Sequence, residues 1–149
     1  MKKKREENKD LKLLLAVGGW SERSEHFSAI AADEQRTNVF INSALSFLSQ
    51  WEFDGIDIDW EFPANAEQGG VPEDKENLPK FLKVSTRNSS GLIFIVESHS
   101  QRFYCKFQAL NDSLKTEDPT GQTKYLLSIA CGTGFNIVEN GYDVKEISA

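Results

Sequence analysis

Long hydrophobic runs are absent from this sequence of 149 residues, and cysteine and histidine are scarce. No stretch approaches the roughly 18 consecutive apolar residues that suggest a membrane-spanning helix, and the apolar stretch 13–17 is too short for the core of a signal peptide. Cys105 and Cys131 form neither a CxxC pair nor a zinc-binding spacing with His26 or His99. We therefore expect no membrane span, no cofactor and no metal site built from cysteine and histidine, and the chain shows no signal peptide.

The residues that are present have the composition of an ordinary globular domain. Hydrophobic residues make up 39% and charged residues 27%, which excludes collagen-like and wholly disordered chains. The net charge is −6, but residues 1–12 hold six basic and three acidic residues, which leaves 11 basic and 20 acidic residues for the rest. An acidic body disfavours binding to nucleic acids. The basic opening is either an interaction patch or the solvated face of a helix, and we favour the helix.

Alternating segment types predict an α/β fold with a parallel sheet. Short apolar runs at 11–17, 53–62 and 125–130 are typical of buried parallel strands. Helical patterns at 33–51 and 73–83 separate them, and the first begins at Asp33, a plausible N-cap. The apolar residues of the first helix recur at helical spacing and predict a stripe that faces the core: Phe40, Ala44, Phe47, Leu48 and Trp51.

The segment 84–108 interrupts this order, although Leu92–Val96 resembles a strand. Without the segment, one continuous helical stripe would run through Leu78, Phe81, Leu82, Leu110 and Leu114. The residues at its two ends can be encoded by codons that resemble splice sites. We interpret the segment as a retained intron or a gene-model error, and the alternative is a genuine insertion. Transcripts in which codon 84 always follows codon 83 would contradict this interpretation.

The run 54–63 carries the strongest chemical signal of the sequence. Side chains alternate along a strand, so Asp57, Asp59 and Glu61 share one face, while Ile56, Ile58 and Trp60 share the other. Same-face neighbours in a strand lie roughly 6–7 Å apart, so the repulsion among three carboxylates must be relieved by shared protons or hydrogen bonds. A carboxyl group that keeps its proton can act as a general acid.

Several kinds of site place carboxylates close together. An EF-hand calcium loop requires glutamate at its twelfth position. That position is Gln68 when counted from Asp57 and Asn65 when counted from Asp54, so the sequence does not fit such a loop. A magnesium site and a solvated edge strand remain open. Glycoside hydrolysis fits best, because it needs one carboxylic acid for the leaving oxygen and a second group for the developing positive centre.

The pattern Asp54-x-x-Asp57-x-Asp59-x-Glu61, with Gly55, Trp60 and Pro63, resembles the active-site strand of glycoside hydrolase family 18, the animal-type chitinases and chitinase-like lectins. Three further segments, 14–20, 72–77 and 141–144, resemble the third strand of that family and the stretches that follow its fourth and fifth strands. The resemblance covers nearly the whole chain except 84–108.

This resemblance implies a (β/α)8 TIM barrel, of which residues 1–149 would be a partial catalytic domain covering about strands 3 to 5, since a complete barrel takes roughly 250 residues. It implies Glu61 as the general acid, Asp59 as the residue that orients the N-acetyl group of the substrate, and Asp57 as the residue that holds Asp59. It also implies that Trp20 stacks on a sugar, with core packing as the alternative. Gly19 and Asp54 are the other candidate substrate-binding residues.

The implied function is endo-hydrolysis of β-1,4-linked N-acetylglucosamine polymers such as chitin, with retention and by a substrate-assisted mechanism. The implied partners are chitin or its oligosaccharides, with no nucleic acid and no membrane, and the parent family is extracellular. We expect the isolated chain to be weakly active or inactive. The alternative function is that of a chitin-binding lectin without hydrolysis. Such lectins usually lack the acid at the position of Glu61, so its presence favours the enzyme.

Overall fold

The computed structural model describes residues 2–87, 92–97 and 125–147. Four strands form one sheet in the order β1-β2-β4-β3, and every pair is parallel. The strands are β1 (Leu14–Gly18), β2 (Gly55–Asp59), β3 (Leu92–Glu97) and β4 (Tyr125–Ala130). The predicted α/β class and the three predicted strand positions are therefore confirmed, and the strand-like run at 92–96 is a strand as well.

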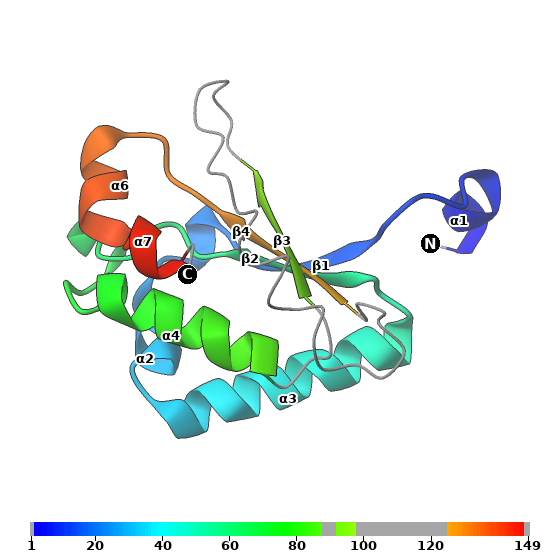
Figure 1. Ribbon diagram of the computed structural model, residues 1–149, viewed down its shortest axis with the longest axis horizontal. Helices are drawn as coiled ribbons and strands as arrows, with labels where there is room; N and C mark the ends of the chain where they lie inside the picture. Colours follow the sequence, from blue (N-terminus) through cyan, green and yellow to red (C-terminus); the bar gives the residue numbers. More distant parts are fainter. Residues whose placement is uncertain (1, 88–91, 98–124, 148–149) are drawn as a thin grey trace.

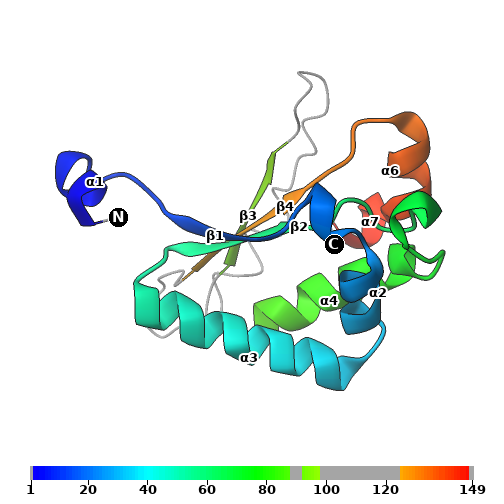
Figure 2. The same ribbon diagram turned by 180° about the vertical axis from the view of Figure 1, so that it is seen from behind.

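Six α-helices and two short 3-10 helices accompany the sheet in the described part of the chain. The α-helices are α1 (Lys2–Glu7), α2 (Glu25–Ala31), α3 (Glu34–Trp51), α4 (Asp74–Arg87), α6 (Phe135–Gly141) and α7 (Val144–Ile147). The 3-10 helices are η1 (Trp20–Glu22) and η2 (Ala66–Gln68). Figures 1 and 2 show that α2, α3 and α4 lie on the same side of the sheet, while α1 projects away from it at the amino terminus. No helix in the described ranges is long and apolar enough to cross a membrane.

The segment 84–108 is only partly described. Helix α4 continues to Arg87, and β3 pairs with the outer side of β4, with Leu92 opposite Tyr125. The other residues of the segment, together with Leu110 and Leu114, lie outside the described residues. The interpretation of the segment as a retained intron stays a prediction.

Helix α3 begins and ends as its sequence suggests, but its core stripe differs in part from the prediction. The side chain of Asp33 accepts a hydrogen bond from the Arg36 amide at 2.9 Å, which confirms the predicted N-cap. Leu48 is buried and Phe40 and Ala44 pack against the core, whereas the prediction was wrong for Phe47 and Trp51. These two side chains are 43% and 53% exposed, because they lie at the margin of the stripe, where Phe47 packs on Trp51 and on the partly buried Phe53.

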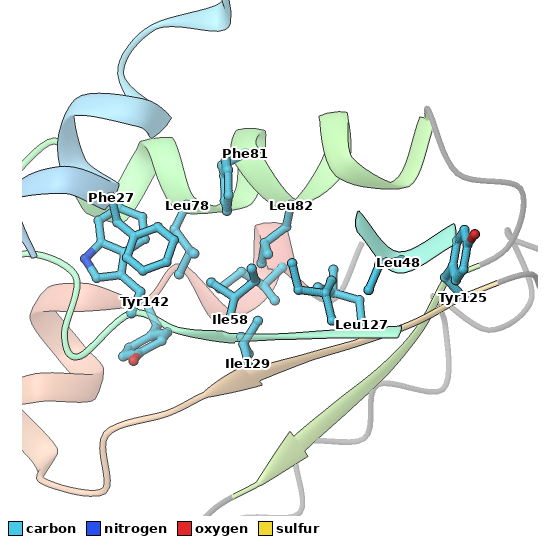
Figure 3. Close-up of a cluster of buried hydrophobic side chains, with 13 residues drawn as sticks. Phe27, Leu48, Ile58, Leu78, Phe81, Leu82, Tyr125, Leu127, Ile129 and Tyr142 are labelled. Atoms are coloured by element: carbon cyan, nitrogen blue, oxygen red, sulfur yellow. The ribbon is translucent and has the colours of Figure 1, made fainter. Parts of the chain in front are cut away.

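The hydrophobic core lies between one face of the sheet and the helices. Figure 3 shows Phe27, Leu78, Phe81 and Leu82 directed from the helices towards side chains of the sheet. The sheet contributes the alternate positions of its two central strands: Ile56, Ile58 and Trp60 from the β2 segment, and Tyr125, Leu127 and Ile129 from β4. Because alternate side chains point in opposite directions, the intervening positions of β2 are left for the other face, where the carboxylates lie.

Candidate active site

The predicted row of carboxylates is present on β2 and the residues that follow it. Asp57, Asp59 and Glu61 are each partly buried, in contrast to the intervening Ile58 and Trp60, which are both 2% exposed. Trp60 stacks on Phe27 with ring centroids 5.6 Å apart, so it packs in the core as predicted. The two faces of this strand are therefore divided between packing and chemistry.

A cleft of about 440 Å³ opens at the carboxyl ends of β2 and β4. Its lining includes all three carboxylates and Phe62 on the β2 side, and residues 129–133 on the β4 side. In TIM barrels the active site lies at this edge of the sheet, because the loops that follow the strands converge there. The structure thus brings Asp57, Asp59 and Glu61 together in the one place where the fold usually carries catalysis.

Asp57 is held by a neighbouring strand. The Ser128 hydroxyl on β4 donates a hydrogen bond of 2.6 Å to Asp57 Oδ1, and the two residues are register partners in the sheet. Ser128 is 2% exposed, so the bond is shielded from water. This bond relieves part of the repulsion expected within the row, and Ser128 is a site residue that the sequence analysis missed. The signal was a single hydroxyl within the apolar run 125–130.

The end of β1 is fitted closely against the end of β2. The Gly19 amide donates a hydrogen bond of 2.8 Å to the Asp59 carbonyl oxygen. Gly18 has φ of +108°, and a Cβ atom at this position would lie 2.5 Å from the same oxygen and 2.7 Å from Cε2 of Phe27. A side chain at Gly18 would therefore push the two strand ends apart. The structure places Gly19 beside the carboxylate row through its backbone.

Trp20 lies beside the cleft and is not part of the core. It begins η1 directly after Gly19, and its side chain is 56% exposed. Its ring meets that of Phe62 edge-on, with centroids 6.3 Å apart, and Phe62 lines the cleft. The exposure contradicts the core-packing alternative and leaves a wide aromatic face accessible.

The structure does not bring Asp54 to the cleft, so its assignment as a substrate-binding residue needs correction. Asp54 precedes β2 and lies at the opposite, amino end of the sheet. Its Oδ2 atom accepts hydrogen bonds from Arg5 Nη2 and from the Leu13 amide, both at 2.7 Å. Asp54 therefore ties α1 and the approach to β1 to the start of β2.

Tyr142 supports the loop on the β4 side of the cleft. Its hydroxyl accepts a hydrogen bond from the Gly132 amide at 3.3 Å and donates one to the Ala130 carbonyl at 3.4 Å. Burial raises the pKa of Tyr142 well above its ordinary range, and the nearby Cys131 and Glu61 act in the same direction. The phenol therefore stays protonated and remains a donor to the loop.

The described residues contain no group of three or more histidine, cysteine, aspartate or glutamate side chains arranged to hold a metal ion. The carboxylates of the cleft can transfer a proton from one carboxyl group while a second carboxylate and the aromatic ring of Trp20 lie nearby. Those are the components of glycoside hydrolysis.

Comparisons with known proteins agree with this assignment. The family model of the glycosyl hydrolases family 18 matches residues 1–149. The chain is 32% identical to chitotriosidase-1 of Mus musculus over 142 residues, which cover 95% of this chain and 25% of the relative. It is 42% identical to an endochitinase of Manduca sexta over 78 residues, which cover 52% of this chain and 14% of the relative.

Solved structures give the same result. The Group IV chitinase of Ostrinia furnacalis in complex with allosamidin matches with a TM-score of 0.67 and 26% identity, over 96% of this chain and 30% of that chain. A glycoside hydrolase family 18 N-acetylglucosaminidase from Paenibacillus barengoltzii matches with a TM-score of 0.68 and 28% identity, over 98% and 35%.

The fold and the site define part of a TIM-barrel glycosidase domain. The chain belongs to glycoside hydrolase family 18. It spans about a quarter of the mouse relative's length.

Proposed function

We propose that this chain carries the catalytic strand of a chitinase that cleaves β-1,4 bonds between N-acetylglucosamine units within the polymer, with retention of configuration. The observation that carries the proposal is the row of Asp57, Asp59 and Glu61 along one cleft, with the exposed Trp20 in ring contact with Phe62, which lines that cleft. Relatives of the chain are named as chitinases, and this supports chitin as the substrate class.

In the proposed mechanism, Glu61 donates a proton to the leaving glycosidic oxygen. The oxygen of the substrate's own N-acetyl group attacks the anomeric carbon as the glycosidic C–O bond breaks, so the enzyme needs no carboxylate nucleophile. A water molecule, which gives a proton to the ionised Glu61, then attacks the same carbon, displaces the N-acetyl oxygen and regenerates the acid with net retention. Asp59 orients that N-acetyl group and balances its developing positive charge. Asp57, held by the Ser128 hydroxyl, keeps Asp59 in place from the next same-face position of the strand.

Two solved relatives support a carbohydrate that carries N-acetyl groups. The Group IV chitinase of Ostrinia furnacalis was solved with allosamidin, and the Group II catalytic domain 2 from the same insect was solved with (NAG)5. We propose that the cleft of this chain accepts the same class of ligand, and that the chain derives from an extracellular enzyme.

The first test measures hydrolysis and binding side by side on residues 1–149. We expect slow release from a fluorogenic chitobioside, with the β-anomer as the first product in an NMR time course, and binding to immobilised chitin. The release should be slow because the described sheet has four of the eight strands of a TIM barrel. Binding without any release is the result expected both of a chitin-binding lectin and of an inactive partial domain, whereas release that Glu61→Gln abolishes would exclude the lectin. Release as fast as that of a complete chitinase would contradict the expected weak activity.

A second test concerns Trp20. We expect Trp20→Ala to weaken binding of a chitin oligosaccharide at least about tenfold, which corresponds to about 1.4 kcal/mol. The reason is that the variant removes the exposed aromatic face beside the cleft. Isothermal titration calorimetry measures the effect.

Trp51→Ala is the matched control, because Trp51 is 53% exposed but lies at the end of α3 and not at the cleft. It should leave the affinity unchanged. Equal losses in the two variants would show that Trp20 is not a specific sugar platform.

A further inference from the structure

A buried polar group lies behind the cleft and contains no residue of the carboxylate row. It consists of Ser24, Ser28 and Asp74, which are 0%, 7% and 0% exposed. Ser24 precedes α2, Ser28 lies one turn further along that helix, and Asp74 begins α4. We refer to these three residues as the loop anchor. Burying polar side chains costs free energy of folding unless they form hydrogen bonds. The hydrogen-bond partners of these three residues therefore indicate their role.

Asp74 is the centre of the loop anchor. Its Oδ2 atom accepts three hydrogen bonds, from the Ser28 hydroxyl at 2.8 Å, the Ala64 amide at 3.1 Å and the Val71 amide at 2.9 Å. The Asp74 amide in turn donates to the Val71 carbonyl at 3.0 Å. The bond from the Val71 amide to the Asp74 side chain resembles one half of a capping box. Asp74 differs from a simple cap because it also binds the amide of Ala64, ten residues earlier. The other carboxylate oxygen of Asp74, Oδ1, is buried and has no hydrogen-bond partner among the described residues.

Ser24 holds the same loop at two other points. Its hydroxyl donates to the Phe62 carbonyl oxygen at 2.7 Å, and its amide donates to the Gln68 carbonyl oxygen at 2.7 Å. Together, Ser24 and Asp74 bind the loop 62–71 at four places along its length. The first of these places is the residue directly after Glu61.

Glu61 lies directly before this loop in the chain. The carbonyl oxygen of the next residue, Phe62, accepts the hydrogen bond from Ser24, so the backbone on the carboxyl side of Glu61 is fixed by the loop anchor. That backbone continues into Phe62 and Ala64, which the loop anchor holds. A general acid must lie within hydrogen-bond reach of the atom it protonates, so small shifts of this loop would move Glu61 out of range.

We propose that Asp74 and Ser24 are positioning residues that direct Glu61 towards the glycosidic oxygen by fixing the loop 62–71. The catalytic part of this inference rests on the proposed function, whereas the structural part does not. The decisive feature is that all three donors converge on one oxygen of Asp74. An asparagine amide oxygen in the same place offers an acceptor to the same donors without the negative charge.

The experiment compares Asp74→Asn, Asp74→Ala and Ser24→Ala in the isotopically labelled chain. The readouts are the hydrogen-exchange rates of the Ala64 and Val71 amides, the 13C carboxyl signal of Glu61, and the kcat and KM for a fluorogenic chitobioside. We expect Asp74→Ala to speed exchange at both amides at least about tenfold, to shift the Glu61 signal and to lower kcat more than it raises KM. Asp74→Asn should stay close to the parent chain in all of them.

Asp33→Ala is the matched control, since Asp33 also caps a helix but is exposed and holds no part of the loop. It should leave the exchange rates, the Glu61 signal and kcat unchanged. The proposal is overturned if Asp74→Ala leaves Glu61 unaffected, if Asp33→Ala changes it equally, or if Asp74→Asn behaves like Asp74→Ala. If Asp74→Ala does not fold, Ser24→Ala decides, because it removes the hydrogen bond to the Phe62 carbonyl oxygen and leaves Asp74 with its three donors, and it must still shift the Glu61 signal. If residues 1–149 show no turnover, kcat gives no readout, and the exchange rates and the Glu61 signal alone decide whether the loop anchor positions Glu61.

Discussion

Replacing Glu61 by glutamine is expected to lower kcat for a fluorogenic chitobioside by about 10²–10⁴-fold, the usual contribution of a general acid. Glutamine keeps the shape of the side chain but has no proton to give to the leaving oxygen. Glu61 is the glutamate among the three carboxylates that line the cleft, and the proposed mechanism gives Asp57 and Asp59 other roles. The affinity for a chitin oligosaccharide should change by no more than about twofold, since proton donation belongs to the transition state.

Asp54→Asn is the matched control for this experiment. Asp54 belongs to the same sequence pattern but lies at the amino end of the sheet, bound to Arg5 and the Leu13 amide. We expect its replacement to leave kcat unchanged and to lower the free energy of unfolding by about 1 kcal/mol, because the ion pair is partly exposed to solvent. A Glu61→Gln variant that keeps most of its turnover would assign proton donation to another group.

The second large effect concerns stability. Trp60→Ala is expected to lower the free energy of unfolding by about 3–5 kcal/mol, because it empties a large volume in the core. Trp60 is 2% exposed and stacks on Phe27, whose ring in turn meets those of Phe40 and Phe81 edge-on. Since small domains are stable by only about 5–15 kcal/mol, this loss is a large part of the total. Urea denaturation monitored by circular dichroism measures it.

Trp60→Phe separates packing from the polar atom of the ring. The Trp60 Nε1 atom is buried and has no hydrogen-bond partner among the described residues, so phenylalanine removes an unsatisfied donor while it keeps an aromatic ring against Phe27. We therefore expect a loss of less than half that of Trp60→Ala. An equal loss in both variants would contradict the view that ring packing is what Trp60 contributes.

The division of β2 into a packing face and a chemical face could be predicted from the sequence. Strand side chains alternate with a period of two, so the spacing of Asp57, Asp59 and Glu61 determines that they share a side. By the same rule, Asp54 lies an odd number of residues before Asp57 and so belongs to the opposite face. The resemblance to the family motif, which includes Asp54, nevertheless led to its assignment as a substrate-binding residue. Helical periodicity likewise located α3, but it could not show that Phe47 and Trp51 lie at the margin of the buried stripe, because exposure depends on which elements pack against the helix.

The loop anchor could not be predicted for a different reason. Asp74 follows another acidic residue at the start of a helix, where acidic side chains are common and usually exposed. What makes Asp74 different is the arrival of Ser28 and Ala64, which are 46 and 10 residues away along the chain. Contacts between such distant residues form only when α2, α4 and the loop 62–71 pack together, so they cannot be predicted from a local sequence pattern.

The three tryptophans occupy three distinct environments, and each therefore provides a separate optical signal. Trp60 is enclosed by the core, Trp20 is exposed beside the cleft and Trp51 is exposed at the end of α3. Acrylamide quenching should reach Trp20 and Trp51 but not Trp60 in the folded chain, and a bound oligosaccharide should shield Trp20 alone. Variants that keep one tryptophan at a time would therefore report folding through Trp60 and sugar binding through Trp20, with Trp51 as the reference and with no label added to the protein.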